Sequence, residues 1–194
     1  MTTATSDQGS APAQATDAAP VDDHVILLAE DGSRIGHTPR ATVHGLDTPL
    51  HLAFSCYLLR EDGQVLLTRR ALAKRTWPGV WTNSFCGHPA PGESMEDAIT
   101  RRAARELGIT VSKVQLALPD FRYRAVDASG IVENEICPVY TAVSSDLVTP
   151  SADEVAEWKW VEPGSLRDAV AAAPWAFSPW LGWQLETWPV SATR

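Results

Sequence analysis

Apolar and polar residues alternate in short runs along most of the chain, and turn residues separate the runs. Two apolar runs flank Asp31-Gly32 in the segment VILLAEDGSRIG, and two longer runs flank Asp62-Gly63 in HLAFSCYLLREDGQVLLTRR. An Asp-Gly pair between apolar runs is typical of a β-hairpin. The pattern therefore predicts two hairpins, and we expect the folded part to begin at His24.

A helix is predicted between the two hairpins and the rest of the chain, starting after Ser94. Ser94 is a good N-cap with Asp97 three residues later, and Gly108 is a typical residue just past a helix end. Apolar residues recur between them at helical spacing, namely Met95, Ala98, Ile99, Ala103 and Leu107. We expect an amphipathic helix.

Strands and helices are interleaved in the second half of the chain. Strand patterns occur in QLALPDFRYRAV and IVENEICPVYTAV, joined through DASG, and again in EWKWV. Helices are expected in SLRDAVAAA and in SPWLGWQLETW, where Ser178 is the N-cap and Pro179 the first helical residue. Because several neighbouring strands form hairpins, we predict an α+β fold, an α/β/α sandwich whose mixed β-sheet is flanked by helices.

Composition sets the boundaries of this domain. Residues 1–22 are rich in Ala, Thr, Ser, Gln and Pro, so we predict a disordered leader followed by a single domain over residues 23–194. No segment approaches the ~20 apolar residues that cross a bilayer, and no secretory signal is recognisable. The three cysteines, Cys56, Cys86 and Cys137, suit a reducing compartment. We expect a cytoplasmic protein without a membrane partner, a monomer or weak homodimer.

The charge of the chain limits its partners. The formal net charge is -8, which argues against nucleic acid as the main partner. An anionic ligand must therefore be held by a local cluster of cations.

Two glutamates in IVENEIC are candidates for metal binding or proton transfer. In a strand, Ile131, Glu133, Glu135 and Cys137 share one face, and the two acidic residues start about 6.6 Å apart, two steps of ~3.3 Å. Paired carboxylates among apolar residues repel each other, and one takes up a proton unless a cation neutralises them. The alternative is the solvated face of an edge strand.

The five histidines change this balance. His24 and His37 lie beside the first hairpin and are interpreted as ordinary surface residues, whereas His44, His51 and His88 lie near loop-to-strand junctions. A lone histidine is more often structural, but three with two same-face glutamates predict a His/Glu metal site. Imidazole and carboxylate together suit a first-row ion such as Mn²⁺ or Zn²⁺ better than a pure Mg²⁺ cage.

Two of the cysteines receive different interpretations. Cys56, in AFSCYLL, is interpreted as a small buried hydrophobe. Cys86 is expected in a polar loop ahead of the helix and beside His88, where a metal or nearby cations would favour its thiolate.

The segment NSFCGHPAPGESMEDAITRRAARELGI resembles a Nudix box, a loop-helix signature whose glutamates bind Mg²⁺ at a diphosphate. Glu93, Arg101 and Glu106 match its spacing, but Arg102 and Arg105 occupy two positions that are acidic in a full box. We expect a box that still binds a diphosphate and is weakened for hydrolysis.

Several longer segments extend the resemblance, namely WPGVWTNSFCGHP, DFRYRA, IVENEICPV and PWAFSPW. With them, the chain from about His24 to Trp180 resembles the type I isopentenyl-diphosphate isomerases, which have a Nudix fold. This resemblance implies that the chain interconverts isopentenyl and dimethylallyl diphosphate by proton transfer, so its partner would be a small isoprenoid diphosphate.

The resemblance also implies individual ligands. A first metal, Mn²⁺, Zn²⁺ or Mg²⁺, would be held by His44, His51, His88, Glu133 and Glu135. A Mg²⁺ ion would bridge to the diphosphate through Glu106. The positions that match phosphate-binding cations are Arg40, Arg70, Lys74 and Arg102.

The implied catalytic residues are Cys86 and Glu135, acting on opposite faces of the substrate, with Tyr123 hydrogen-bonded near Glu135. Trp180 would provide an electron-rich wall for a tertiary carbocation. The other tryptophans of the C-terminal region, Trp175, Trp183 and Trp188, are expected to pack the core. Two alternatives stay open: a Nudix hydrolase, which the arginines in the box and the thiol disfavour, and a non-catalytic metal- or diphosphate-binding module.

Overall fold

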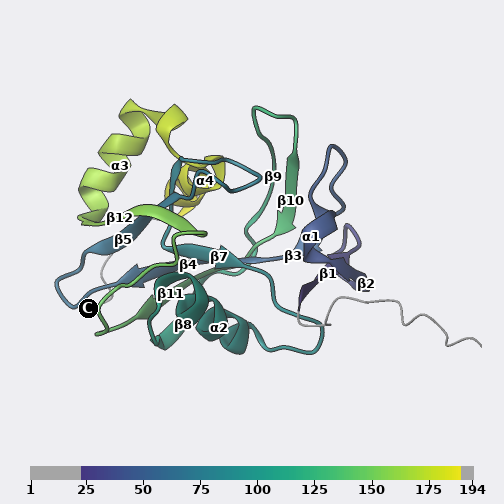
Figure 1. Ribbon diagram of the computed structural model, residues 1–194, viewed down its shortest axis with the longest axis horizontal. Coiled ribbons are helices and arrows are strands. Elements are labelled where there is room, and N and C mark those ends of the chain that lie inside the picture. Colours follow the sequence, from purple (N-terminus) through teal and green to yellow (C-terminus); the bar gives the residue numbers. More distant parts are fainter. Residues whose placement is uncertain (1–22, 189–194) are drawn as a thin grey trace, which may run out of the picture.

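Two mixed β-sheets lie next to each other in the computed structural model, which describes residues 23–188 (Figure 1). The leader predicted for residues 1–22 lies outside the described residues. The five-stranded sheet has the order β2-β1-β3-β10-β9 and the larger sheet the order β12-β5-β4-β11-β8, with β6 paired to β5 and β7 to β4. The β3–β10 and β4–β11 pairs are parallel and the other pairs antiparallel, so the predicted mixed α+β fold is confirmed.

The smaller sheet and its short helix comprise β1 (His24–Leu28), β2 (Arg34–Pro39), α1 (Arg40–Val43), β3 (His51–Leu52), β9 (Arg122–Val126) and β10 (Val132–Ile136). The strands of the larger sheet are β4 (Phe54–Leu59), β5 (Val65–Arg70), β6 (Trp81–Thr82), β7 (Phe85–Gly87), β8 (Ser112–Leu118), β11 (Val139–Val143) and β12 (Val155–Val161). The remaining helices are α2 (Met95–Leu107), α3 (Pro163–Ala172), the 3₁₀ turn η2 (Pro174–Ala176) and α4 (Pro179–Thr187).

The division into two sheets corrects the prediction of one sheet. Each of the two long strand segments is broken in the middle, at Pro119 and at Cys137-Pro138, so β8 and β11 join one sheet while β9 and β10 join the other. Proline has no N–H to donate to a sheet ladder, which explains a break at these positions. On the other side of the junction only Ala53 separates β3 from β4. The chain therefore crosses between the sheets three times, and the crossings from β3 to β4 and from β10 to β11 run side by side in parallel.

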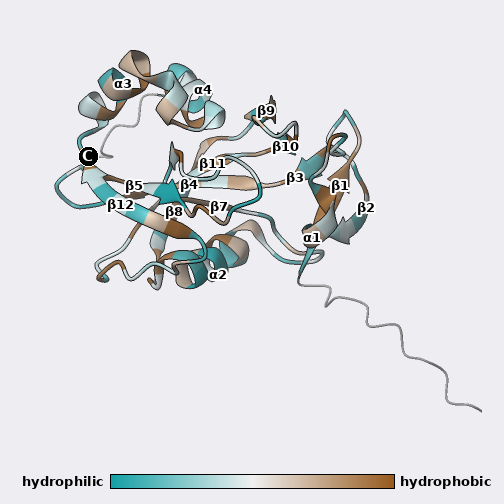
Figure 2. Cartoon of the chain, turned by 45° about the horizontal axis from the view of Figure 1, so that its top comes forward, coloured by the Kyte–Doolittle hydropathy of each residue, from teal (hydrophilic) through white to brown (hydrophobic). Residues whose placement is uncertain are grey.

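Helices cover both faces of the larger sheet, with α2 on one face and α3 and α4 on the other (Figure 2). All of β4 is buried because each face has a helical partner. Phe54 and Leu58 pack with the α2 residue Ile99, whereas Tyr57 packs with the α4 residue Leu181. Burying one such side chain contributes about 1.5–3 kcal/mol, so the two helices anchor the sheet that carries the site.

The predicted helix boundaries are confirmed at α2. The Ser94 hydroxyl oxygen accepts a hydrogen bond from the Asp97 N–H at 3.1 Å, and Gly108 ends the helix with a left-handed φ of +66°. At α4, Ser178 occupies the N-cap position as predicted, but its hydroxyl is hydrogen-bonded to Thr82 at 2.8 Å and does not cap the helix. Through this contact, α4 is fixed to the strand pair that leads into the site.

Both predicted hairpins are confirmed, but the second is split. The strands β4 and β5 pair directly only at Leu59 and Val65, next to the turn. Farther along, β7 pairs with β4 and β6 pairs with β5. Residues 81–87 are therefore inserted between the arms of the hairpin, and Cys86 lies on a strand opposite Ser55. The expectation of a loop around Cys86 was wrong, because this pairing involves residues distant in sequence.

The expected core packing of the tryptophans is confirmed only for Trp188, whose ring lies 5.4 Å from that of Tyr57. Trp175 is 82% exposed and Trp183 is 39% exposed. The buried side of α4 is formed by Trp180, Leu181, Gln184 and Leu185, so Trp183 falls on the other side of the helix. Among the described residues, no helix is both long and apolar enough to cross a bilayer.

Candidate active site

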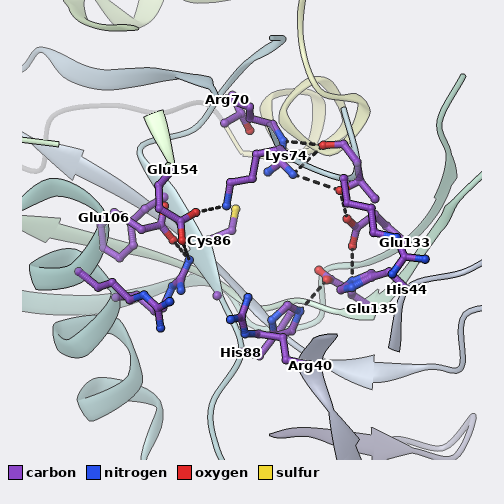
Figure 3. A pocket seen from close by; sticks show the side chains of 18 of the residues that line it. Arg40, His44, Arg70, Lys74, Cys86, His88, Glu106, Glu133, Glu135 and Glu154 are labelled. Carbon is purple, nitrogen blue, oxygen red and sulfur yellow. Dashed lines mark hydrogen bonds and ion pairs between the residues drawn. The ribbon is translucent and has the colours of Figure 1, made fainter. Parts of the chain in front are cut away.

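A cavity of about 570 Å³ is lined by residues from both sheets and from α1, α2 and α4. Nearly every residue that the sequence predicted for the site lines this cavity; His51 is the exception, since it is fully buried. Figure 3 shows two groups of polar side chains in the cavity with Cys86 between them. One side carries histidines and glutamates and the other carries Glu106, Glu154 and Lys74.

The first group, the His/Glu group, consists of His44, His51, His88 and Glu135, whose candidate ligand atoms all lie within 4.8 Å of one another. It forms at the junction of the sheets, where Glu135 in β10 is paired in parallel with His51 in β3. His44 directly follows α1 and His88 directly follows β7. Backbone pairing therefore assembles the group from segments far apart in the chain.

The protonation of His51 shows that this group fits a metal ion. Its Nδ1 lies 2.9 Å from the Pro49 carbonyl oxygen, which only accepts hydrogen bonds, so Nδ1 carries the proton and Nε2 of the neutral ring has a lone pair. That Nε2 is buried, lacks a well-formed hydrogen bond and lies 3.3 Å from Glu135 Oε1. Two acceptors at this distance require a proton or a cation between them. A divalent metal satisfies the requirement, and the imidazole-carboxylate set suits it.

The carboxylates of β10 are both buried, which excludes the solvated edge strand considered from the sequence. Glu135 Oε2 accepts a hydrogen bond from the Tyr123 hydroxyl at 2.9 Å, and Oε1 lies 3.1 Å from His88 Nε2. Burial alone would raise the pKa of Glu135, but the neighbouring imidazoles of His51 and His88 outweigh it and the pKa lies well below its ordinary value. Glu135 is therefore ionised in the folded protein.

Glu133 adjoins the His/Glu group through His44, whose Nε2 lies 3.0 Å from Glu133 Oε2. The His44 Nε2 atom is also buried without a well-formed hydrogen bond. The other carboxylate oxygen, Oε1, accepts a hydrogen bond from the Thr76 hydroxyl at 2.7 Å. Four of the five predicted metal ligands therefore converge, and the fifth, Glu133, lies beside them. Glu133 contacts a buried imidazole nitrogen that has no well-formed hydrogen bond.

Cys86 is half-buried, and its thiol lies 3.4 Å from the Ser55 hydroxyl and 3.3 Å from the Asn83 amide oxygen. Burial raises the pKa of this thiol to about 11, and the carboxylates of Glu135 and Glu106 also raise it, although the Ser55 and Asn83 hydrogen bonds oppose them. The expected stabilisation of a thiolate by the surrounding protein is therefore wrong for the protein groups alone. A bound cation is the remaining source of such stabilisation.

The second group, the charged cluster, consists of Lys74, Arg102, Glu106 and Glu154. Figure 3 labels Lys74, Glu106 and Glu154 on one side of the cavity. Glu154 forms ion pairs with Lys74 and with Arg102, the latter at 3.6 Å, and Arg102 also pairs with Glu106. The Arg102 Nε is buried without a hydrogen-bond partner. Burial lowers the pKa of Lys74 to about 8, although Glu106 acts to raise it. Lys74 and Arg102 thus bring two cations to the cavity wall, each paired with a carboxylate.

Glu154 was not predicted from the sequence, because a single acid in the turn before β12 has no distinguishing pattern.

Two of the predicted phosphate-binding arginines have partners within the protein. Arg40 is paired with Asp23 at 2.9 Å on the cavity wall. Arg70 donates to the Thr76 carbonyl at 2.8 Å and to the Trp77 carbonyl at 3.2 Å. These contacts occupy part of each guanidinium group that the sequence assigned to phosphate binding.

An aromatic wall closes the cavity on the side of α4. Trp180 is buried, and its indole N–H points to Thr82 Oγ1 at 3.1 Å and Asn83 Oδ1 at 3.2 Å. Its ring centre lies 5.5 Å from that of Tyr123 and 5.2 Å from that of Trp77. The fixed indole places a π-face among the residues that line the cavity.

His24 lines the cavity, with its ring 5.0 Å from the exposed His37, so its interpretation as an ordinary surface residue was wrong.

The loop before α2 is held by Arg101. Arg101 donates to both oxygens of Glu93 at 2.7 Å and to the His88 carbonyl at 3.1 Å. These bonds tie the glycine-containing loop to α2 and lower the pKa of Glu93.

The fold and the sequence of residues 49–181 define the class of protein. The NUDIX domain model matches residues 49–181. Similar solved structures include DR0079 from Deinococcus radiodurans, with a TM-score of 0.66 and 19% identity over 84% of this chain and 98% of that chain. The MutT protein from Methanosarcina mazei Go1 has a TM-score of 0.56 and 19% identity over 74% of this chain and 95% of that chain. At this identity the likeness shows the fold alone.

Sequence relatives narrow the class. An isopentenyl-diphosphate Delta-isomerase from Leifsonia xyli subsp. xyli is 65% identical over 86% of this chain and 91% of the relative. Proteins of the same name from Paenarthrobacter aurescens and Agromyces mediolanus are 61% and 58% identical, covering 82% and 92% of this chain and 87% of each relative. The chain belongs to the isopentenyl-diphosphate Delta-isomerase family of NUDIX-domain proteins.

Proposed function

We propose that this protein is an isomerase that interconverts isopentenyl diphosphate and dimethylallyl diphosphate. The observation that carries the proposal is the joint lining of one cavity by a thiol, a tyrosine-bonded carboxylate, a buried indole and a cluster of cations. Family membership supports the same reaction. The isomerisation forms one C–H bond at the terminal carbon of the alkene. It breaks one C–H bond at the methylene group on the other side of the substituted alkene carbon. The reaction therefore needs an acid, a base and protection of the intermediate cation from water.

The proton-transfer groups are Cys86 on one side of the substrate and Glu135 with Tyr123 on the other. The hydrogen bond between Tyr123 and Glu135 gives a short path for a proton toward the alkene. Cys86 removes or supplies the second proton, and its hydrogen bonds to Ser55 and Asn83 hold the thiol in place. No bond of the diphosphate is broken in either direction.

Trp180 stabilises the tertiary cation between the two proton transfers. A desolvated aromatic face attracts a cation by about 2 kcal/mol. The hydrogen bonds from its indole N–H to Thr82 and Asn83 prevent the ring from turning away. Tyr123 and Trp77, packed beside it, exclude water that would capture the cation.

The charged cluster binds the end of the substrate that does not react. Lys74 and Arg102 are the principal contacts, with Arg40 and Arg70 contributing from the cavity wall. These interactions use binding energy remote from the alkene to orient it between the catalytic groups. Glu106 would hold a Mg²⁺ ion, whose positive charge would help to bind the diphosphate.

The metal of the His/Glu group would be Mn²⁺, Zn²⁺ or Mg²⁺, held by His44, His51, His88, Glu133 and Glu135. A bound divalent ion supplies positive charge that lowers the pKa of neighbouring acids. Glu135 then remains oriented toward Tyr123 through its second oxygen. We further propose that the protein acts in the cytoplasm as a monomer or weak homodimer; its free cysteines are consistent with a reducing compartment.

Hydrolysis of a diphosphate is disfavoured by the contacts of the NUDIX segment. Arg102 occupies a position that is acidic in a full Nudix box, and it is paired with Glu106. This part of α2 therefore does not offer several carboxylates to the metal ions that hydrolysis needs. A thiol at the centre of the cavity also has no role in attack by water. A binding module without catalysis would not need the bonded pair of Tyr123 and Glu135.

Proton NMR of isopentenyl diphosphate with the protein and Mg²⁺ in D₂O tests the function, alongside an assay of phosphate release. We expect dimethylallyl diphosphate containing deuterium, without released phosphate. In Cys86→Ala we expect turnover to fall by roughly 10²–10⁴-fold while pyrophosphate binding persists. Cys56→Ala is the matched control, because Cys56 is buried against α2 and does not line the cavity. Phosphate release without isomerisation, or full turnover by Cys86→Ala, would contradict the proposal.

A further inference from the structure

A loop between β5 and β6 connects every part of the cavity. It carries Lys74 of the charged cluster, Thr76, which contacts Glu133, and Trp77, which packs against Trp180. From the sequence, Lys74 is the residue of this loop that is expected to bind phosphate. Its other residues therefore include side chains whose contribution to the site is unassigned.

Arg70 holds the loop from inside. Its Nη2 donates to the Thr76 carbonyl at 2.8 Å and to the Thr76 hydroxyl oxygen at 3.1 Å, while its Nε lies 3.2 Å from the Trp77 carbonyl. Trp77 has a φ of +42°, a left-handed conformation that costs a non-glycine residue about 1–2 kcal/mol. Such a conformation persists where surrounding contacts enforce it. Arg70 supplies these contacts, because it binds the carbonyl oxygens of both Thr76 and Trp77.

The hydroxyl of Thr76 has a defined direction. A threonine hydroxyl has one proton to donate and lone pairs to accept. Since it accepts from Arg70, its proton is directed to Glu133 Oε1, which lies 2.7 Å away. Thr76 is 5% exposed, so both bonds are largely shielded from water.

We infer that Thr76 is a positioning residue of the metal site: its hydroxyl, held by Arg70, sets the orientation of the Glu133 carboxylate. With Oε1 bonded to Thr76, the carboxylate presents Oε2 to His44, at 3.0 Å from its Nε2. Figure 3 shows Glu133 and His44 next to each other on this side of the cavity. The inference rests on the proposed function only in that the His/Glu group holds a divalent metal.

This arrangement differs from ordinary packing because it acts through one proton. Valine has nearly the shape of threonine but cannot donate to Glu133 or accept from Arg70. Glu133 would keep its charge and burial and would lose the bond that selects its rotamer. Loss of an outer hydrogen bond to a metal ligand typically weakens metal binding by about 10- to 100-fold.

Calorimetry of Mn²⁺ binding to the full-length protein tests the inference without a measurement of turnover. We expect Thr76→Val to raise the Kd for Mn²⁺ by about 10- to 100-fold, and Thr76→Ser, which keeps the hydroxyl, to restore binding close to that of the wild type. Thr141→Val is the matched control, since Thr141 is also buried but lies in β11 and does not line the cavity. Thr76→Ala repeats the test with a smaller side chain should Thr76→Val fail to fold.

A second arm uses Glu133→Gln as the background. Because Thr76 acts through Glu133, adding Thr76→Val to Glu133→Gln should weaken Mn²⁺ binding no further. Unchanged binding by Thr76→Val, or equal weakening in both backgrounds, would overturn the inference. Isomerisation by the wild type is measured in parallel: if it is absent while the Thr76 pattern holds, the proposed function fails and the positioning role stands.

Discussion

The pH dependence of substrate capture tests the role assigned to Lys74. Lys74 lies in the charged cluster, and its ammonium group is expected to bind the diphosphate. The perturbation is a pH series from roughly pH 6 to 10 on the wild type and on Lys74→Arg. The wild type loses the positive charge within this range, whereas an arginine keeps its charge throughout.

The expected midpoint follows from the surroundings of Lys74. Burial lowers its pKa from 10.5 to about 8, and the positive charges of Arg70, Arg102 and Arg40 also act to lower it, while Glu106 opposes them. A cation is charged below its pKa, so about 90% of Lys74 is charged at pH 7 and about 10% at pH 9. The favourable contact with the diphosphate is therefore present below pH 8 and is lost as the pH rises through this value.

The assay is kcat/KM for isopentenyl diphosphate as a function of pH, because kcat/KM reports ionisations of the free enzyme. We expect kcat/KM of the wild type to fall with a midpoint near pH 8, by up to about tenfold per pH unit above this midpoint. In Lys74→Arg this fall should disappear. Lys159→Arg is a suitable control, because Lys159 is exposed on β12. A flat wild-type profile, or the same midpoint in Lys74→Arg, would refute the assignment.

The remaining predictions concern one charge in the site and one turn in the fold. Glu135→Gln preserves shape but removes the carboxylate, so we expect turnover to fall by at least about 10²-fold and Mn²⁺ binding to weaken; unchanged rate and metal content would contradict the metal assignment. Gly108→Ala places a Cβ 2.8 Å from the Thr149 carbonyl oxygen at a φ of +66°, so urea unfolding should show a loss of at least about 2 kcal/mol. Gly164→Ala, with nothing within 4 Å, is its control, and equal stability of the two variants would argue against the strain.

Several parts of the fold were predictable because they depend on neighbours within a few residues. The boundaries of α2 follow from Ser94 and Gly108, which cap the helix through contacts three or four residues away. The prolines at 119 and 138 were visible in the sequence and mark the breaks that divide the sheets, but we interpreted each long segment as one strand. The competing signal was the continuous apolar pattern on both sides of each proline.

The membership of the site was also largely predictable. The alternation in β10 placed Glu133 and Glu135 on one face, and the longer motifs indicated the histidines, the thiol and the cations that line the cavity. The surroundings of these residues were not predictable. A metal or nearby cations were expected to favour the thiolate of Cys86, whereas burial of the thiol between the arms of a split hairpin raises its pKa to about 11.

The sequence by itself determined the local elements, the residue types of the site and the family resemblance. Only the tertiary structure decided how those residues are held. Ser55 and Cys86 are 31 residues apart, Thr76 and Glu133 are 57 apart, and Lys74 and Glu154 are 80 apart. Capping and strand alternation act between near neighbours, so they are readable along the chain. A hydrogen bond between distant segments depends on the packing of the whole sheet, and no local pattern encodes it.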